Sequence, residues 1–103
     1  MSDLPDFDRT RDVDKVRGFA RHAFTRGSHS FFEDLQTYND GHYRVLFDPS
    51  YFVLGEGQAQ PSRSQWNTLK KHLKRMDRQL FVFKAHGFTE AGSAYVDFGF
   101  FRD

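Results

Sequence analysis

The chain has no cysteine and no isoleucine, and it has no long run of apolar residues. The absence of cysteine excludes disulfides, zinc–thiolate sites and cysteine nucleophiles. A membrane-spanning helix needs about 20 consecutive apolar residues, and no such run occurs. Residues 1–11 lack the apolar stretch of a secretory signal, so we expect a cytoplasmic protein with no membrane partner.

Phenylalanine occurs thirteen times in 103 residues, as often as valine and leucine together. Aromatic side chains bury large areas and suit the half-buried surface of a pleated sheet. They are also the side chains that often anchor partners at protein interfaces. Two interpretations follow from this excess: an unusually aromatic core, or an aromatic surface kept for a partner.

The length and the charge distribution predict one folded unit with a polar end. A chain of 103 residues has the ordinary size of a single domain. We expect a flexible acidic N-terminal tail at 1–10 and a single α+β domain at 11–103. The net charge is only +1, but residues 1–14 hold five Asp against two Arg, whereas residues 63–78 hold six Lys or Arg against one Asp.

Residues 12–26 are predicted to form an amphipathic helix. Apolar residues recur there at helical spacing: Val13, Val16, Ala20, Ala23 and Phe24. Asp12 is a suitable N-cap, and Gly27 is a suitable C-terminal stop.

Residues 63–77 carry the clearest helical pattern. Ser62 followed by Gln65 has the spacing of a capping box. One apolar stripe follows at helical spacing: Trp66, Leu69, Leu73 and Met76.

Residues 30–38 fit two structures. Ser30 followed by Glu33 has the spacing of a capping box, and Phe31, Leu35 and Tyr38 recur at helical spacing. We therefore predict a second short helix, with a strand as the alternative.

Residues 42–55 and 80–101 are predicted to form two β-hairpins. In the first, Pro49 occupies a favoured turn position between two apolar segments. In the second, residues 80–83 are apolar on both faces, which predicts a central strand covered on both sides. The predicted fold is α+β, a two-layer sandwich in which two or three helices pack on a four-stranded, mostly antiparallel sheet, in the order α(α)ββαββ.

A sheet so rich in aromatic residues leaves three outcomes open. Helices cover both faces, a second copy of the chain covers one face, or one face stacks bases or binds another partner. The second outcome predicts a homodimer through an aromatic sheet face, with candidate interface residues Phe81, Phe83 and Phe101.

The helix predicted at 63–78 also carries a basic face. On a helical wheel, one contiguous arc beside the apolar stripe holds Arg63, Lys70, Lys71, Lys74, Arg75 and Arg78. Clustered cations neutralise phosphates, so this face is a candidate nucleic-acid-binding surface. The plainer interpretation is the solvated face of an ordinary surface helix.

Few residues are candidates for metal binding or acid–base catalysis. None of the five histidines forms a pair at a recognised metal-ligand spacing, so no metal or cofactor is predicted. His42 and His86 lie at strand ends and are candidates to meet at one sheet edge. Asp97 interrupts an aromatic strand, where it is either an acid–base carboxylate near His86 or the cross-strand partner of Lys84 or Arg44.

These observations favour a non-enzymatic binding or regulatory domain that self-associates. The alternative is a nucleic-acid-binding module that uses the basic helix 63–78. A third hypothesis is a small enzyme with a site near His86 and Asp97.

Overall fold

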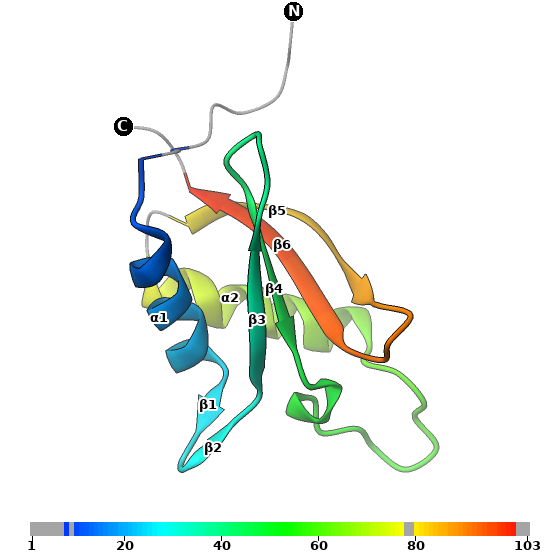
Figure 1. The fold of residues 1–103 in the computed structure, drawn as a ribbon. Helices are drawn as coiled ribbons and strands as arrows, with labels where there is room; N and C mark the ends of the chain where they lie inside the picture. The colour runs from blue at the N-terminus through cyan, green and yellow to red at the C-terminus, as the bar shows by residue number, and fades with distance from the viewer. Residues whose placement is uncertain (1–7, 9, 78–79, 101–103) are drawn as a thin grey trace, which may run out of the picture.

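The computed structural model describes residues 8, 10–77 and 80–100, and it has the α+β architecture that the sequence predicts (Figure 1). In chain order the elements are α1 (Val13–Ala23), β1 (Thr25–Arg26), β2 (His29–Ser30), β3 (Phe32–Thr37), β4 (Tyr43–Phe47), the 3₁₀ turn η1 (Pro49–Tyr51), α2 (Arg63–Met76), β5 (Leu80–Phe88) and β6 (Ala94–Phe100).

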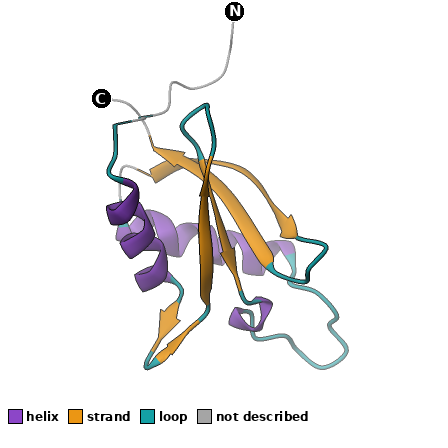
Figure 2. Ribbon diagram, in the orientation of Figure 1, coloured by secondary structure: helices purple, strands orange, loops and turns teal. Residues whose placement is uncertain are grey.

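Four strands form an antiparallel sheet in the order β3-β4-β6-β5, and β1 and β2 form a separate two-stranded ribbon. The central pairing joins segments far apart in sequence, because Tyr43 lies opposite Phe98 and Phe47 lies opposite Ala94. Helices α1 and α2 pack on the same face of this sheet, and α2 runs behind the strands in the view of Figure 2. The opposite face carries no helix of the part of the chain that the structure describes.

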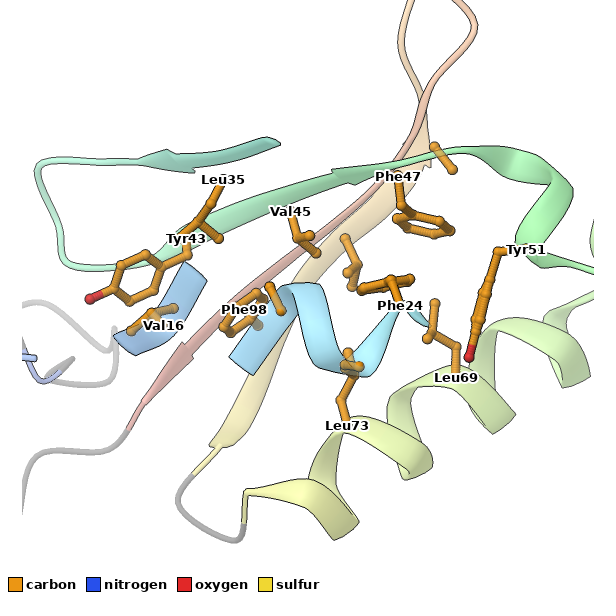
Figure 3. Packing of buried hydrophobic residues seen from close by; sticks show 14 of the residues in the cluster. Val16, Phe24, Leu35, Tyr43, Val45, Phe47, Tyr51, Leu69, Leu73 and Phe98 are labelled. Carbon is orange, nitrogen blue, oxygen red and sulfur yellow. The ribbon is translucent and has the colours of Figure 1, made fainter. Parts of the chain in front are cut away.

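The alternation of β4 explains which face is covered. Tyr43, Val45 and Phe47 are buried, while Arg44 and Leu46 point to the other face and are half-buried. The Phe47 ring stacks on Phe24, the residue that follows α1, with centroids 4.3 Å apart (Figure 3). Part of the aromatic excess is therefore core. The buried aromatic residues are Phe24, Tyr43, Phe47, Tyr51, Trp66, Phe98 and Phe100. Those partly buried against this core are Phe19, Phe31, Phe32, Phe52 and Phe83.

Both long helices begin as predicted. The Asp12 carboxylate caps α1 by accepting a hydrogen bond from the Asp14 N–H, and the capping box of Ser62 and Gln65 opens α2. Helix α1 ends at Ala23, earlier than predicted, and Gly27 is not its stop. Instead Gly27, with a positive φ of 58°, forms the turn between β1 and β2.

The helix predicted at 30–38 is wrong. Residues Phe32–Thr37 form strand β3, which pairs with β4. The Glu33 carboxylate accepts a hydrogen bond from the Ser93 hydroxyl, so it does not close a capping box on Ser30. Only Leu35 of this strand is fully buried, and the ladder with β4 supplies the backbone hydrogen bonds that a helix would have supplied.

The hairpin predicted at 42–55 is also wrong in its second half. After β4 the chain makes the 3₁₀ turn at Pro49–Tyr51, and residues 52–62 form no strand. Tyr51 and Phe52 turn their rings onto Phe47 of the core, with centroids 5.8 Å away in each case. Val53, in the middle of the predicted strand, is 78% exposed. The first hairpin is instead β3–β4. The sheet has the predicted four strands, but β3 takes the place of the strand predicted after Pro49.

The hairpin predicted at 80–101 is confirmed as β5–β6. The position predicted for its first strand is wrong, because β5 pairs only with β6 among the described residues and lies at the edge of the sheet. The central strands are β4 and β6. Most of the acidic tail predicted at 1–10 lies outside the described residues, which include only Asp8 and Thr10 of that segment.

Candidate functional site

Helix α2 separates apolar and basic side chains cleanly. Trp66, Leu69 and Leu73 face the sheet and are at most 5% exposed. No Asp or Glu occurs anywhere in Arg63–Met76. The outer face of this helix is therefore positive at Arg63 and over Lys70–Arg75, with no carboxylate of its own to neutralise it.

A groove of about 710 Å³ runs between α2 and the end of α1. Its basic wall consists of Arg26, Lys71, His72 and Arg75. The remaining lining residues are Ala23, Thr25, Tyr51, Phe52, Val53, Gln65, Thr68 and Leu69, so none of the described residues that line it is a carboxylate. We call it the α1–α2 groove. Among the described residues, Arg26, Lys71 and Arg75 make no ion pair with a carboxylate.

Two contacts hold basic side chains of the groove in place. The Arg26 guanidinium lies 4.1 Å from the centroid of the Tyr51 ring, in a cation–π arrangement. The His72 Nε2 atom lies 3.3 Å from the Ala23 carbonyl oxygen, which can only accept, so Nε2 carries the proton and donates. The positive charge of the groove therefore comes from Arg26 of β1 and from Lys71 and Arg75 of α2, whereas α1 contributes only Ala23.

A second hollow, near the start of α1, has a different character. Its volume is about 530 Å³, and its lining mixes Arg11 and Lys15 with Asp8, Asp12 and Asp77. The Arg11 guanidinium pairs with the Asp77 carboxylate at 3.3 Å and with Asp8 at 3.6 Å. With three carboxylates against two cations, this hollow is not a positive surface.

The structure divides the predicted basic residues between two flanks of α2. Lys71 and Arg75 line the α1–α2 groove. Lys70 and Lys74 lie on the other flank, with their ammonium groups 5.7 and 5.9 Å from the centroid of the Phe83 ring. Arg63 is exposed at the first turn of the helix, and Arg78 lies outside the described residues.

Sequence reasoning missed Arg26, His72 and Tyr51 as members of this surface. His72 falls beside the basic arc of the helical wheel, so its position on the helix was a usable signal. Arg26 and Tyr51 come from other segments, and only the packing of α1 and η1 against α2 brings them to the groove. No local pattern contains that information.

On the β5 flank, the rings of His86 and Trp66 stack with centroids 4.3 Å apart and an interplanar angle of 23°. Phe88, which is 39% exposed, lies edge-on to the same indole at 6.0 Å. Partial burial, together with the positive charge of Lys70, lowers the pKa of His86 below its ordinary value. This shift favours the uncharged form of the His86 ring.

The acid–base pair suggested for His86 and Asp97 is wrong, because the two residues lie on opposite faces of the sheet. His86 pairs with Val96 and faces the helices, whereas Asp97 pairs with Arg44 on the open face. The Asp97 carboxylate accepts two hydrogen bonds from Arg44, at 2.7 and 3.0 Å. This bond raises the pKa of Arg44, and the predicted cross-strand partnership of Asp97 with Arg44 is confirmed.

His42 and His86 do not meet at one sheet edge. His42 stacks on Tyr38 with centroids 4.3 Å apart and contacts Asp40, while His86 stacks on Trp66. His42 directly precedes β4 and His86 lies within β5, and strand β6 separates these two strands. Within the described ranges, no group of three His, Asp or Glu side chains is placed to hold a metal ion.

The predicted interface residues are only partly visible. Phe83 is half-buried beside Lys70 and Lys74. The side chain of Phe81 and the whole of Phe101 lie outside the described residues, so the predicted aromatic interface stays a prediction.

Comparisons with known protein families, with curated proteins and with solved structures found no match for this chain. None of the helices in the described ranges is long and apolar enough to cross a membrane. The chemistry of the α2 surface is thus the main guide to function.

Proposed function

We propose that this chain is a binding domain that takes nucleic acid along the basic surface of α2. The observation that carries the proposal is the α1–α2 groove, where Arg26, Lys71 and Arg75 converge without a carboxylate among the lining residues. Lys70 and Lys74 continue the positive surface over the other flank of the helix. A row of phosphates spaced along a strand fits such a row of cations.

The small net charge of the chain does not oppose this proposal. Charges more than about 10 Å apart are screened at physiological salt, so binding depends on the local surface. The carboxylates near α1 are engaged with Arg11, while the groove cations face solvent without such partners among the described residues. Local charge of one sign is what attracts a polyanion.

A salt series with a labelled oligonucleotide tests the proposal. If about five cations neutralise phosphates of a single strand, affinity falls about 100-fold between about 50 and about 200 mM salt. Lys71→Glu combined with Lys74→Glu reverses one cation on each flank of α2 and is expected to abolish measurable binding. Absence of binding by the unaltered protein at the lowest salt overturns the proposal.

The matched control places the same charge reversal on another helix. Lys15→Glu combined with Arg17→Glu changes the net charge equally, but both residues belong to α1 and neither lines the α1–α2 groove. This variant is expected to keep its affinity within a few-fold. Equal losses in both variants would show that only total charge matters and that α2 is no specific surface.

Self-association is the second candidate function. The observation that favours it is the sheet face opposite the helices, which carries Leu46 and Tyr95 around the pair of Arg44 and Asp97. A second copy placed on that face would form an isologous dimer. Light scattering over a concentration series tests it: a mass that doubles with concentration supports the dimer, and a constant monomer mass rejects it.

A further inference from the structure

Three aromatic side chains of β5 line the margin of the sheet beside α2. Phe83, His86 and Phe88 pair with Phe98, Val96 and Ala94 of β6, respectively. Those β6 partners are buried under the helices, yet the β5 rings are at the sheet edge and reach solvent. His86 is exposed, Phe88 is 39% exposed and Phe83 is half-buried. We call these three residues the β5 platform.

Packed rings support two members of the platform, His86 and Phe88. The Trp66 indole stacks under His86 and meets Phe88 edge-on, and Phe52 packs against the same indole with centroids 4.8 Å apart. Trp66 itself is 5% exposed, so it supports the outer rings without competing for a ligand. A preordered ring loses little conformational freedom when a second ring stacks on it.

Cations flank the platform. Lys70 and Lys74 hold their ammonium groups within 6 Å of the Phe83 ring centroid. Lys70 is also close enough to His86 to act on its titration. The same helix turns Lys71 and Arg75 toward the α1–α2 groove. From β5 across α2, the surface therefore presents the aromatic rings first and then cations that have no ion pair with a carboxylate among the described residues.

We propose that the nucleic acid is single-stranded and that its bases stack on the β5 platform while its phosphates lie on Lys70 and Lys74. This inference rests on the proposed function. Exposed rings backed by packed rings and flanked by cations are the arrangement by which proteins hold single strands without reading sequence. A duplex keeps its base faces inside the stack, so it offers the platform nothing.

Three labelled probes of equal length separate bases from phosphates: an oligothymidine of about 15 nucleotides, a duplex, and an abasic strand that keeps the phosphates. We expect the oligothymidine to bind more tightly than the abasic strand. Phe88→Ala is expected to weaken oligothymidine binding about 5- to 100-fold and to leave binding of the abasic strand unchanged. Phe88→Leu, which keeps apolar volume but has no ring, is expected to show the same loss.

Tyr38→Ala is the matched control, because Tyr38 is also 39% exposed but directly follows β3, the edge strand on the opposite side of the sheet from β5. This variant is expected to bind all three probes like the unaltered protein. Circular dichroism of each variant checks that the fold is kept.

Two results would overturn the inference while the proposed function stands. One is equal affinity for oligothymidine and abasic strands together with loss of both after Lys71→Glu and Lys74→Glu. The other is unchanged oligothymidine binding in both Phe88 variants. If none of the probes binds at low salt, the proposed function and the inference fall together.

Discussion

Arg44 and Asp97 face each other across β4 and β6 and form two parallel hydrogen bonds on the open face of the sheet. The Arg44 guanidinium also lies 4.0 Å from the centroid of the Tyr95 ring. The Asp97 side chain is 7% exposed, whereas the Arg44 side chain is 29% exposed. The pair is therefore asymmetric: the carboxylate is enclosed, and the guanidinium reaches water.

This asymmetry predicts unequal costs for the two single substitutions. Arg44→Met leaves a buried carboxylate without its partner and is expected to lower the free energy of unfolding by about 3 kcal/mol. Asp97→Asn leaves an arginine that can turn to solvent and is expected to cost about 1 kcal/mol. Urea denaturation of both variants and of the double variant measures the coupling. A larger cost for Asp97→Asn would contradict the assignment of the enclosed group.

Asp40 predicts how stability depends on acid. Partial burial raises its pKa, but hydrogen bonds from the His42 backbone N–H, the Lys84 ammonium and the His42 ring outweigh burial and hold that pKa well below its ordinary value of 3.8. A carboxyl with a depressed pKa stabilises the fold above its unfolded value, and this contribution is lost as the pH falls through its folded value.

The Asp40→Asn variant tests this expectation. It is expected to be less stable than the unaltered protein at neutral pH, with the difference shrinking as the pH falls below 3.8. Urea midpoints measured from neutral pH into the acid range follow the difference. A stability gap that stays constant with pH would mean that the charge of Asp40 is not what stabilises this corner.

The sequence predicts those parts of the fold that depend on neighbours in the chain. The N-caps at Asp12 and Ser62 and the hairpin β5–β6 involve residues close in sequence, and all three are confirmed. The helical spacing at 30–38 led to a wrong prediction, because backbone pairing with β4 outweighs the local preference for a helix. In the resulting strand β3 only Leu35 is buried. The pairing of β4 with β6 joins segments about fifty residues apart, and no local pattern announces it.

The candidate site follows the same division. The basic arc of α2 could be predicted because it lies on one helix with known geometry. The division of this arc between two flanks could not be predicted. Lys71 and Arg75 line one groove with Arg26 only because α1 packs beside α2. Lys70 acts electrostatically on His86 only because β5 lies next to α2. The rings of the β5 platform reach solvent because β5 is an edge strand, and the sequence did not predict that position.

The capping box of α2 predicts a stability effect of ordinary size. The Ser62 hydroxyl accepts a hydrogen bond from the Gln65 N–H at 3.2 Å, and the Gln65 side-chain oxygen accepts one from the Ser62 N–H at 2.8 Å. Ser62→Ala is expected to lower the free energy of unfolding by about 1 kcal/mol. The control is Ser64→Ala, inside the exposed first turn, which is expected to be neutral or slightly stabilising. A thermal or urea transition shows whether only the first variant loses stability.

Trp66 offers a direct view of the β5 platform, because it is the only tryptophan in the chain and its indole stacks on His86. A base that stacks on the outer side of His86 comes close enough to change the indole emission. We therefore expect oligothymidine to alter Trp66 fluorescence with the same midpoint as its binding curve. The abasic strand is expected to bind without this change, since its phosphates contact α2 but nothing stacks on the platform. If oligothymidine binds and the emission stays constant, the bases lie elsewhere on the protein.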